Sequence, residues 1–150
     1  IRDSRQSRGL GDVYKRQSGE REFLLREKAN KQWINRAFDL LKEDQISDLV
    51  VVFHGEPFVD WMMPQPSLLY PGFSETVGAS LFEKAMKTDK NILLINGDTH
   101  RYKWDHPFYG AGLNSGNVSR LVVPGARDMR AVKISIQRND ENYYSLDLIE

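Results

Sequence analysis

Three side chains of the kinds that bind divalent metals stand directly after two apolar runs of the sequence. His54 follows the run from Leu49 to Phe53, while Asp98 and His100 follow the run from Asn91 to Asn96. An imidazole and carboxylate set of this composition suits zinc, manganese or iron. Asp98 and His100 are two residues apart, so in a tight loop both side chains would turn toward one ion or two adjacent ions.

These residues also have simpler interpretations. A single histidine after a strand more often forms hydrogen bonds within a loop than binds a metal, and an Asp beside Gly and Thr more often serves an Asx-turn or an N-cap. The chain has three histidines, and the third, His106, lies six residues beyond His100. That coincidence favours a metal site, and the loop interpretation of each residue remains open.

Four residues after the second run are candidates to line a substrate pocket. They are Arg101, Tyr102, Asp105 and His106. The alternative for all four is ordinary loop hydrogen bonding and solvation at the rim of a site.

The elements that must position these residues are read from apolar periodicity. Ala29, Trp33, Ala37, Leu40 and Leu41 recur at helical spacing, and the two apolar runs are short and suit strands buried on both faces. The expected order is a helix over 20–43, a strand over 49–53, a long loop over 55–73, a helix over 74–89 capped by Ser74, a strand over 91–96, a Gly-rich loop over 110–116, and strands over 120–123, 131–137 and 143–149.

This order predicts the α/β class, with two buried strands and their helices followed by antiparallel strands. If the two buried strands are parallel neighbours, the residues that follow them meet in one crevice, which is where open α/β sheets bind ligands. The spacing of the elements therefore supports the grouping of His54, Asp98 and His100.

The first 17 residues stand apart from this pattern. Ser7 to Gln17 reads SRGLGDVYKRQ, which resembles the in-frame translation of a common transposase sequencing adapter. We therefore expect residues 1–17 to be a disordered, non-native tail, and residues 18–150 to be the natural part of the chain.

Charge excludes several classes of function. Removing the tail's five basic and two acidic residues from totals of 21 and 21 leaves 16 against 19, a mildly acidic domain of net charge about minus three. No nucleic-acid partner is indicated, and no apolar stretch is long enough to span a membrane. The absence of cysteine rules out a disulfide scaffold and a thiolate metal site, and it fits either cytoplasm or periplasm.

Four segments together resemble the calcineurin-like metallophosphoesterases, and in particular a bacterial branch with a GDxH block. The segments are REKANKQWINRAFDLLKED, VVVFHGEPF, LLINGDTHRYKWDHPF and SRLVVPG, and the likeness spans about Glu20 to Ile149. The resemblance implies the C-terminal half of an αββα sandwich, with His54 and His100 as metal ligands. Asp98 stands where most members have a histidine, so the resemblance implies either that it binds the metal or that it holds a ligand or a metal-bound water.

The same resemblance implies hydrolysis of a small phosphate-ester substrate with two divalent ions, Mn, Fe or Zn. The family's early DxH, GDxxD and GNHD blocks do not precede His54 in this chain, and the one DxH string, Asp98 to His100, belongs to the late GDxH block. We therefore expect the chain to be a fragment without its N-terminal metal-binding blocks, inactive as it stands.

Two rival interpretations were weighed. A hydrolase with Thr99 of GDTH as nucleophile fits poorly, because such a block normally opens a chain and needs a later Asp and His pair. A metal-free α/β binding or interaction module, in which the GDTH loop is structural, fits the fragment better than it fits the whole gene. A truncated half-domain would expose a sheet edge and an apolar face through which it would self-associate.

Overall fold

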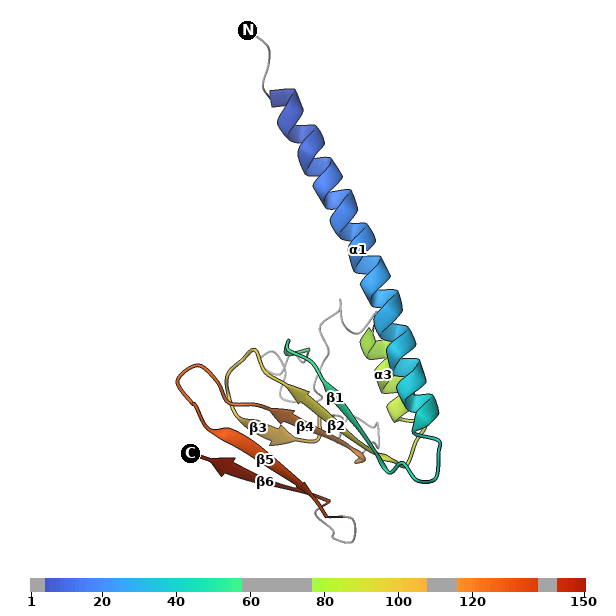
Figure 1. The fold of residues 1–150 in the computed structure, drawn as a ribbon, viewed down its shortest axis with the longest axis vertical. Helices are drawn as coiled ribbons and strands as arrows, with labels where there is room; N and C mark the ends of the chain where they lie inside the picture. Colours follow the sequence, from blue (N-terminus) through green and yellow to red (C-terminus); the bar gives the residue numbers. More distant parts are fainter. Residues whose placement is uncertain (1–4, 58–76, 108–115, 138–142) are drawn as a thin grey trace.

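A computed structural model gives the fold, and it describes residues 5–57, 77–107, 116–137 and 143–150, with side chains from residue 19 onward. Figure 1 shows the elements in chain order. They are α1 (Arg5–Leu40), β1 (Asp48–Val52), α3 (Val77–Ala85), β2 (Asn91–Asn96), β3 (Lys103–Asp105), β4 (Val118–Val122), β5 (Ala131–Ile136) and β6 (Tyr144–Ile149). The expected Ser74 cap, most of the 55–73 loop and most of the Gly-rich loop lie outside the described residues.

The central sheet has four strands in the order β1-β2-β4-β3. β1 pairs with β2 in parallel, from Asp48 opposite Asn91 to Val52 opposite Ile95, and β2 pairs with β4 in parallel. The expected parallel neighbours are thus confirmed. β3 runs antiparallel to β4 and was not predicted, because three residues with one apolar side chain carry no periodic signal.

The two faces of the sheet are covered by different elements. On one face Ile92, Leu94 and Val118 pack against Phe38 of α1 and Leu81 of α3. Alternation along a strand turns the neighbouring residues to the other face. There, Leu93 and Leu121 pack with Tyr144 and other apolar residues of β5 and β6. The sheet therefore lies between helices and a hairpin.

The closing hairpin is a separate two-stranded antiparallel sheet, with Ala131 opposite Ile149 and Ile136 opposite Tyr144. The antiparallel finish is confirmed. Two tyrosines tie the hairpin to the start of β1, because the Tyr143 hydroxyl donates to Asp48 Oδ2 at 2.7 Å and the Tyr144 hydroxyl donates to Oδ1 at 3.4 Å.

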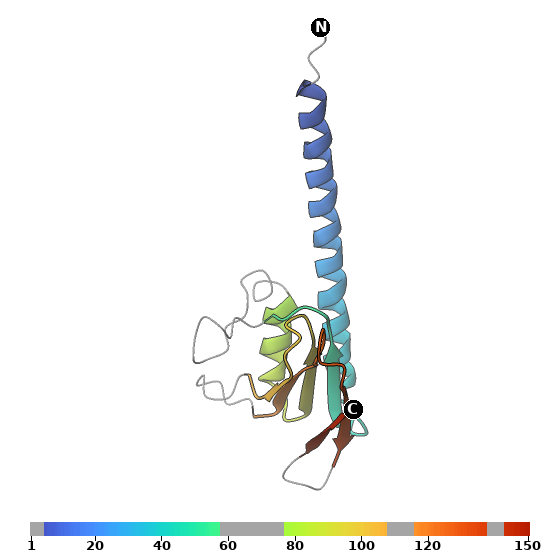
Figure 2. The same cartoon turned by 90° about the vertical axis from the view of Figure 1, so that its left-hand side faces the viewer.

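α1 differs from its expected form at both ends. It begins at Arg5, within the segment expected to be a disordered tail, and Figures 1 and 2 show it extending far beyond the sheet. Its buried side carries Ile34 and Phe38, and Leu41, directly after the helix, is also buried. The expected stripe is confirmed at Leu41 and wrong at Trp33 and Leu40, which are 77% and 46% exposed, because the helix meets the sheet only with its last turns. No helix among the described residues is long and apolar enough to cross a membrane.

The expectation that β1 is buried on both faces is also wrong. Val50 is 45% and Val52 is 70% exposed. β1 lies at the edge of the sheet, and the hairpin packs on Leu93, Ile95 and Leu121 of the inner strands instead. An apolar run predicts a strand but does not say whether the strand is central.

Candidate functional site

The loops that follow β1 and β2 lie side by side. The backbone N–H of Phe53 donates to the carbonyl of Ile95 at 3.0 Å, and that of Gly97 donates to the carbonyl of His54 at 3.0 Å. Parallel pairing thus continues past the ends of both strands. His54 and the turn Gly97 to His100 therefore share one end of the sheet, as the sequence predicted.

His54 is solvent-exposed and its ring lies next to Gly97. A Cβ built at Gly97 would lie 3.9 Å from His54 Nδ1 and 3.7 Å from the His54 carbonyl oxygen. Those are ordinary contact distances, so Gly97 is not needed to make room for the imidazole. The histidine keeps its side chain at the surface of the site.

The tight turn after β2 is made by left-handed backbone at Asp98 and His100. Their φ angles are 70° and 58°, a region that costs energy for residues other than glycine. The carboxylate of Asp98 accepts a hydrogen bond from the backbone N–H of Glu56 at 3.5 Å. The strained turn thus presents exposed side chains above the sheet.

The imidazole of His100 lies against the turn that follows β4. A Cβ at Gly125 would come within 3.0 Å of His100 Cδ2 and 3.3 Å of Cγ. A side chain at Gly125 would therefore push the ring away. Gly125 is the last residue of the SRLVVPG segment, so this packing places the end of that segment against His100.

The donor types of the three candidate ligands suit a divalent metal, but their placement does not complete a site. No group of three or more His, Cys, Asp or Glu side chains in the described parts of the chain is arranged to hold a metal ion. His54 lies beside Gly97, Asp98 accepts from Glu56, and His100 faces Gly125.

The four candidate pocket residues separate into two pairs. Arg101 and Tyr102 are exposed between β2 and β3. Asp105 is the last residue of β3 and accepts two hydrogen bonds from a buried arginine. His106 is exposed, and its Nδ1 lies 3.2 Å from the Val118 carbonyl oxygen and 3.4 Å from Ser119 Oγ. Asp105 and His106 therefore already contact groups within the protein, and a substrate would have to compete with those groups or add to them.

A buried polar cluster next to the site was not predicted. Arg120 on β4 is fully buried and donates from Nε and Nη2 to Asp105 at 2.8 and 2.6 Å, and from Nη1 to Glu56 Oε1 at 3.1 Å. Glu56 Oε2 in turn accepts from Asn96 Nδ2 at 2.9 Å. The local signal was a single charge inside the apolar run VSRLVV.

The charge state of this cluster follows from its contacts. Burial raises the pKa of Asp105, but the hydrogen bonds and charge of Arg120, together with Lys103, outweigh burial and hold that pKa below its usual value. Asp105 therefore stays a carboxylate at neutral pH and compensates the buried guanidinium.

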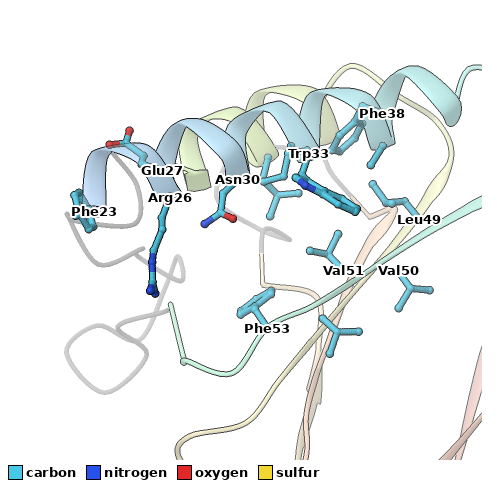
Figure 3. A pocket seen from close by; sticks show the side chains of 14 residues that line it. Phe23, Arg26, Glu27, Asn30, Trp33, Phe38, Leu49, Val50, Val51 and Phe53 are labelled. Atoms are coloured by element: carbon cyan, nitrogen blue, oxygen red, sulfur yellow. The ribbon is translucent and has the colours of Figure 1, made fainter. Parts of the chain in front are cut away.

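An apolar groove of about 900 Å³ lies away from the polar cluster, between α1 and the open edge of β1. Figure 3 shows Trp33 and Phe38 of α1 facing Leu49 and Val51 of β1. The groove ends at Phe53, which directly precedes His54. Most of its lining is apolar, and Arg26, Glu27 and Asn30 of α1 line it as well.

Comparison with known protein families, with curated proteins and with solved structures finds no match to this chain. The structure itself shows a mixed α/β arrangement of helices and of parallel and antiparallel strands.

Proposed function

We propose that this chain is the C-terminal part of a calcineurin-like metallophosphoesterase, a metal-dependent hydrolase of small phosphate esters built as an αββα sandwich. The observation that carries the proposal is the joining of two loops at one end of parallel neighbours. His54 follows β1, Asp98 and His100 follow β2, and the Gly97 amide binds the His54 carbonyl. This is the position at which α/β sheets bind ligands.

In the intact protein, His54, Asp98 and His100 would supply part of the ligand set for two divalent ions, Mn, Fe or Zn. Such ions polarise phosphate oxygens and activate water. Arg101 and Tyr102 are exposed beside the turn and suit contact with an anionic substrate. The described residues hold no complete group of metal ligands. We therefore assign metal ligands to this chain, and no catalytic step.

The test begins with the source DNA upstream of the codon for Ser18. An open frame carrying DxH, GDxxD and GNHD would support the proposal. The rejoined protein, which is the product of that longer open frame, should then hydrolyse a generic phosphodiester. His54→Ala and His100→Ala should each lower the rate of hydrolysis at least about tenfold. A start codon close to Ser18, with none of these blocks, would overturn it.

The 150-residue chain by itself should show no metal-dependent hydrolysis of the same phosphodiester, because it holds no complete metal group in its described residues. A phosphodiester with a coloured leaving group measures this hydrolysis, because the absorbance rises as the leaving group is released in the presence of added Mn²⁺ or Zn²⁺. Activity equal to that of the rejoined protein would contradict the assignment of essential ligands to the other blocks.

The second candidate is a metal-free binding or interaction module, and the groove along β1 favours it. Phe23 and Trp33 are 57% and 77% exposed on α1, beside the edge of β1, which pairs with β2 alone among the strands that the structure describes. A strand edge without charged residues between Leu49 and Phe53 is a template for pairing with another chain. Self-association through this edge is the simplest form of that function.

A further inference from the structure

Three contacts fasten the loop after β1 to the loop after β2. The Gly97 amide donates to the His54 carbonyl at 3.0 Å, and the Glu56 amide donates to Asp98 Oδ2 at 3.5 Å. The Asn96 side chain donates to Glu56 Oε2 at 2.9 Å. Glu56 takes part in two of the three contacts, once through its backbone and once through its carboxylate.

The carboxylate of Glu56 is itself held by a fixed cation. Arg120 donates from Nε and Nη2 to Asp105, and from Nη1 to Glu56 Oε1 at 3.1 Å. A carboxylate only accepts hydrogen bonds, so one oxygen serves Arg120 and the other serves Asn96. Because the guanidinium fork is planar and buried, Glu56 has little freedom to move.

The orientation of Asn96 shows what this contact requires. Asn96 is 1% exposed, and its amide nitrogen must face the acceptor Glu56. Its Oδ1 is then buried with no donor among the residues that the structure describes. A buried acceptor without a donor carries an energetic cost. The contact between Glu56 and Asn96 is kept in spite of that cost.

We infer that Glu56 is a positioning residue. By bridging Arg120 and Asn96, it holds His54, two residues before it, against the turn that carries Asp98 and His100. We call the bridge from Arg120 through Glu56 to Asn96 the clamp. The role of the two loops in binding metal rests on the proposed function, whereas the clamp rests on the hydrogen bonds described above.

Amide hydrogen exchange tests the clamp in the chain as it exists. The Gly97 amide is the reporter, because its hydrogen bond to His54 joins the same two loops. In Glu56→Gln, which keeps the side-chain volume and removes the charge, exchange at Gly97 should accelerate about tenfold or more. Amides of Leu94 and Leu121 in the core strands should keep their wild-type rates.

Glu83→Gln is the matched control, since Glu83 pairs with Lys87 on the exposed side of α3. It should leave Gly97 unchanged. Unchanged exchange at Gly97 in Glu56→Gln would overturn the inference, and so would equal acceleration at Leu94 and Leu121, which would indicate a general structural role. A start codon close to Ser18 would overturn the proposed function and would not change the exchange rate of the Gly97 amide. Failure of the proposed function and failure of the inference about Glu56 are therefore distinguishable.

Discussion

Arg120 is the residue around which the polar interior of this protein is organised. Its side chain has no exposed surface, so its charge must be compensated inside the protein. Asp105 accepts two of its hydrogen bonds side by side, and Glu56 accepts a third. Through Glu56 the same charge reaches the loop that carries His54.

Removing the guanidinium should be costly. We expect Arg120→Met to lower the free energy of unfolding by about 3–5 kcal/mol, because Asp105 and Glu56 would lose the buried cation that both of them contact. Urea denaturation followed by circular dichroism measures the loss. Arg130→Met, which removes the exposed partner of Asp128, should leave the urea midpoint nearly unchanged. Equal losses in the two variants would contradict the buried-charge account.

Acid should weaken the fold through Asp105. Its pKa in the folded protein lies below the ordinary 3.8, so the stability that it contributes is complete above the unfolded pKa and is lost as pH falls through the folded pKa. Asp105→Asn should be less stable than wild type at neutral pH. It should then lose less further stability between about pH 4 and pH 2. Urea midpoints over that range give the comparison, and parallel curves would refute it.

The sequence indicated these residues only in part. Arg120 could be noticed as a charge within an apolar strand, and His54, Asp98 and His100 could be placed at strand ends. The partners of Arg120 could not be found, because Glu56 is 64 residues away and no local pattern encodes such a pairing. The left-handed backbone of Asp98 and His100 was likewise hidden, since neither is glycine.

At the scale of elements, the hairpin β5–β6 acts as a cover for the inner strands. It packs Val132, Ile134 and Leu146 on the cluster around Leu93 and Leu121. The hydroxyls of Tyr143 and Tyr144 attach the hairpin to β1, because both donate hydrogen bonds to Asp48. Burial raises the pKa of Tyr144, and the nearby Asp48 charge adds to the effect, so this hydroxyl remains a donor.

Asp48→Ala should therefore loosen the hairpin. The variant leaves the buried Tyr144 hydroxyl without this acceptor, at a cost of about 1–3 kcal/mol. Hydrogen exchange should accelerate in β5 and β6 more than in β2 and β4. Asp147→Ala, which removes an exposed partner of Lys133 in the same hairpin, is the control and should leave exchange unchanged. Uniform acceleration throughout the sheet would argue against a separate cover.

Element prediction succeeded where apolar periodicity was strong. The strand Asn91–Asn96 has the predicted bounds, and β5 ends within one residue of its prediction. The face that α1 buries and the exposure of β1 were mispredicted, because they depend on which neighbours the elements meet. Periodicity describes one element at a time.

At the scale of the whole molecule, β1 forms one edge of the central sheet. β1 has β2 on one side, while on the other side the described residues form the apolar groove beneath α1. Val52 is 70% exposed there. Such an edge favours pairing with a second copy of the chain.

We expect the chain to dimerise reversibly as its concentration rises, and Val52→Lys to weaken that dimerisation, because a charge at the edge disfavours strand pairing. Sedimentation equilibrium measures the dissociation constant. Ile136→Lys introduces the same charge on the hairpin, where the native side chain is 48% exposed, and should leave dimerisation unchanged. A chain that stays monomeric at millimolar concentration would rule out association through β1.

The reach of α1 has a hydrodynamic consequence. Its 36 residues give a rod about 54 Å long, against a radius of gyration of about 15 Å for a compact chain of 150 residues. A particle with such a protrusion meets more friction than a sphere of the same mass. It should tumble slowly and leave a sizing column early, at a volume typical of a larger globular protein. An early elution peak is thus the expected behaviour of the monomer, and mass must be taken from a method that does not depend on shape.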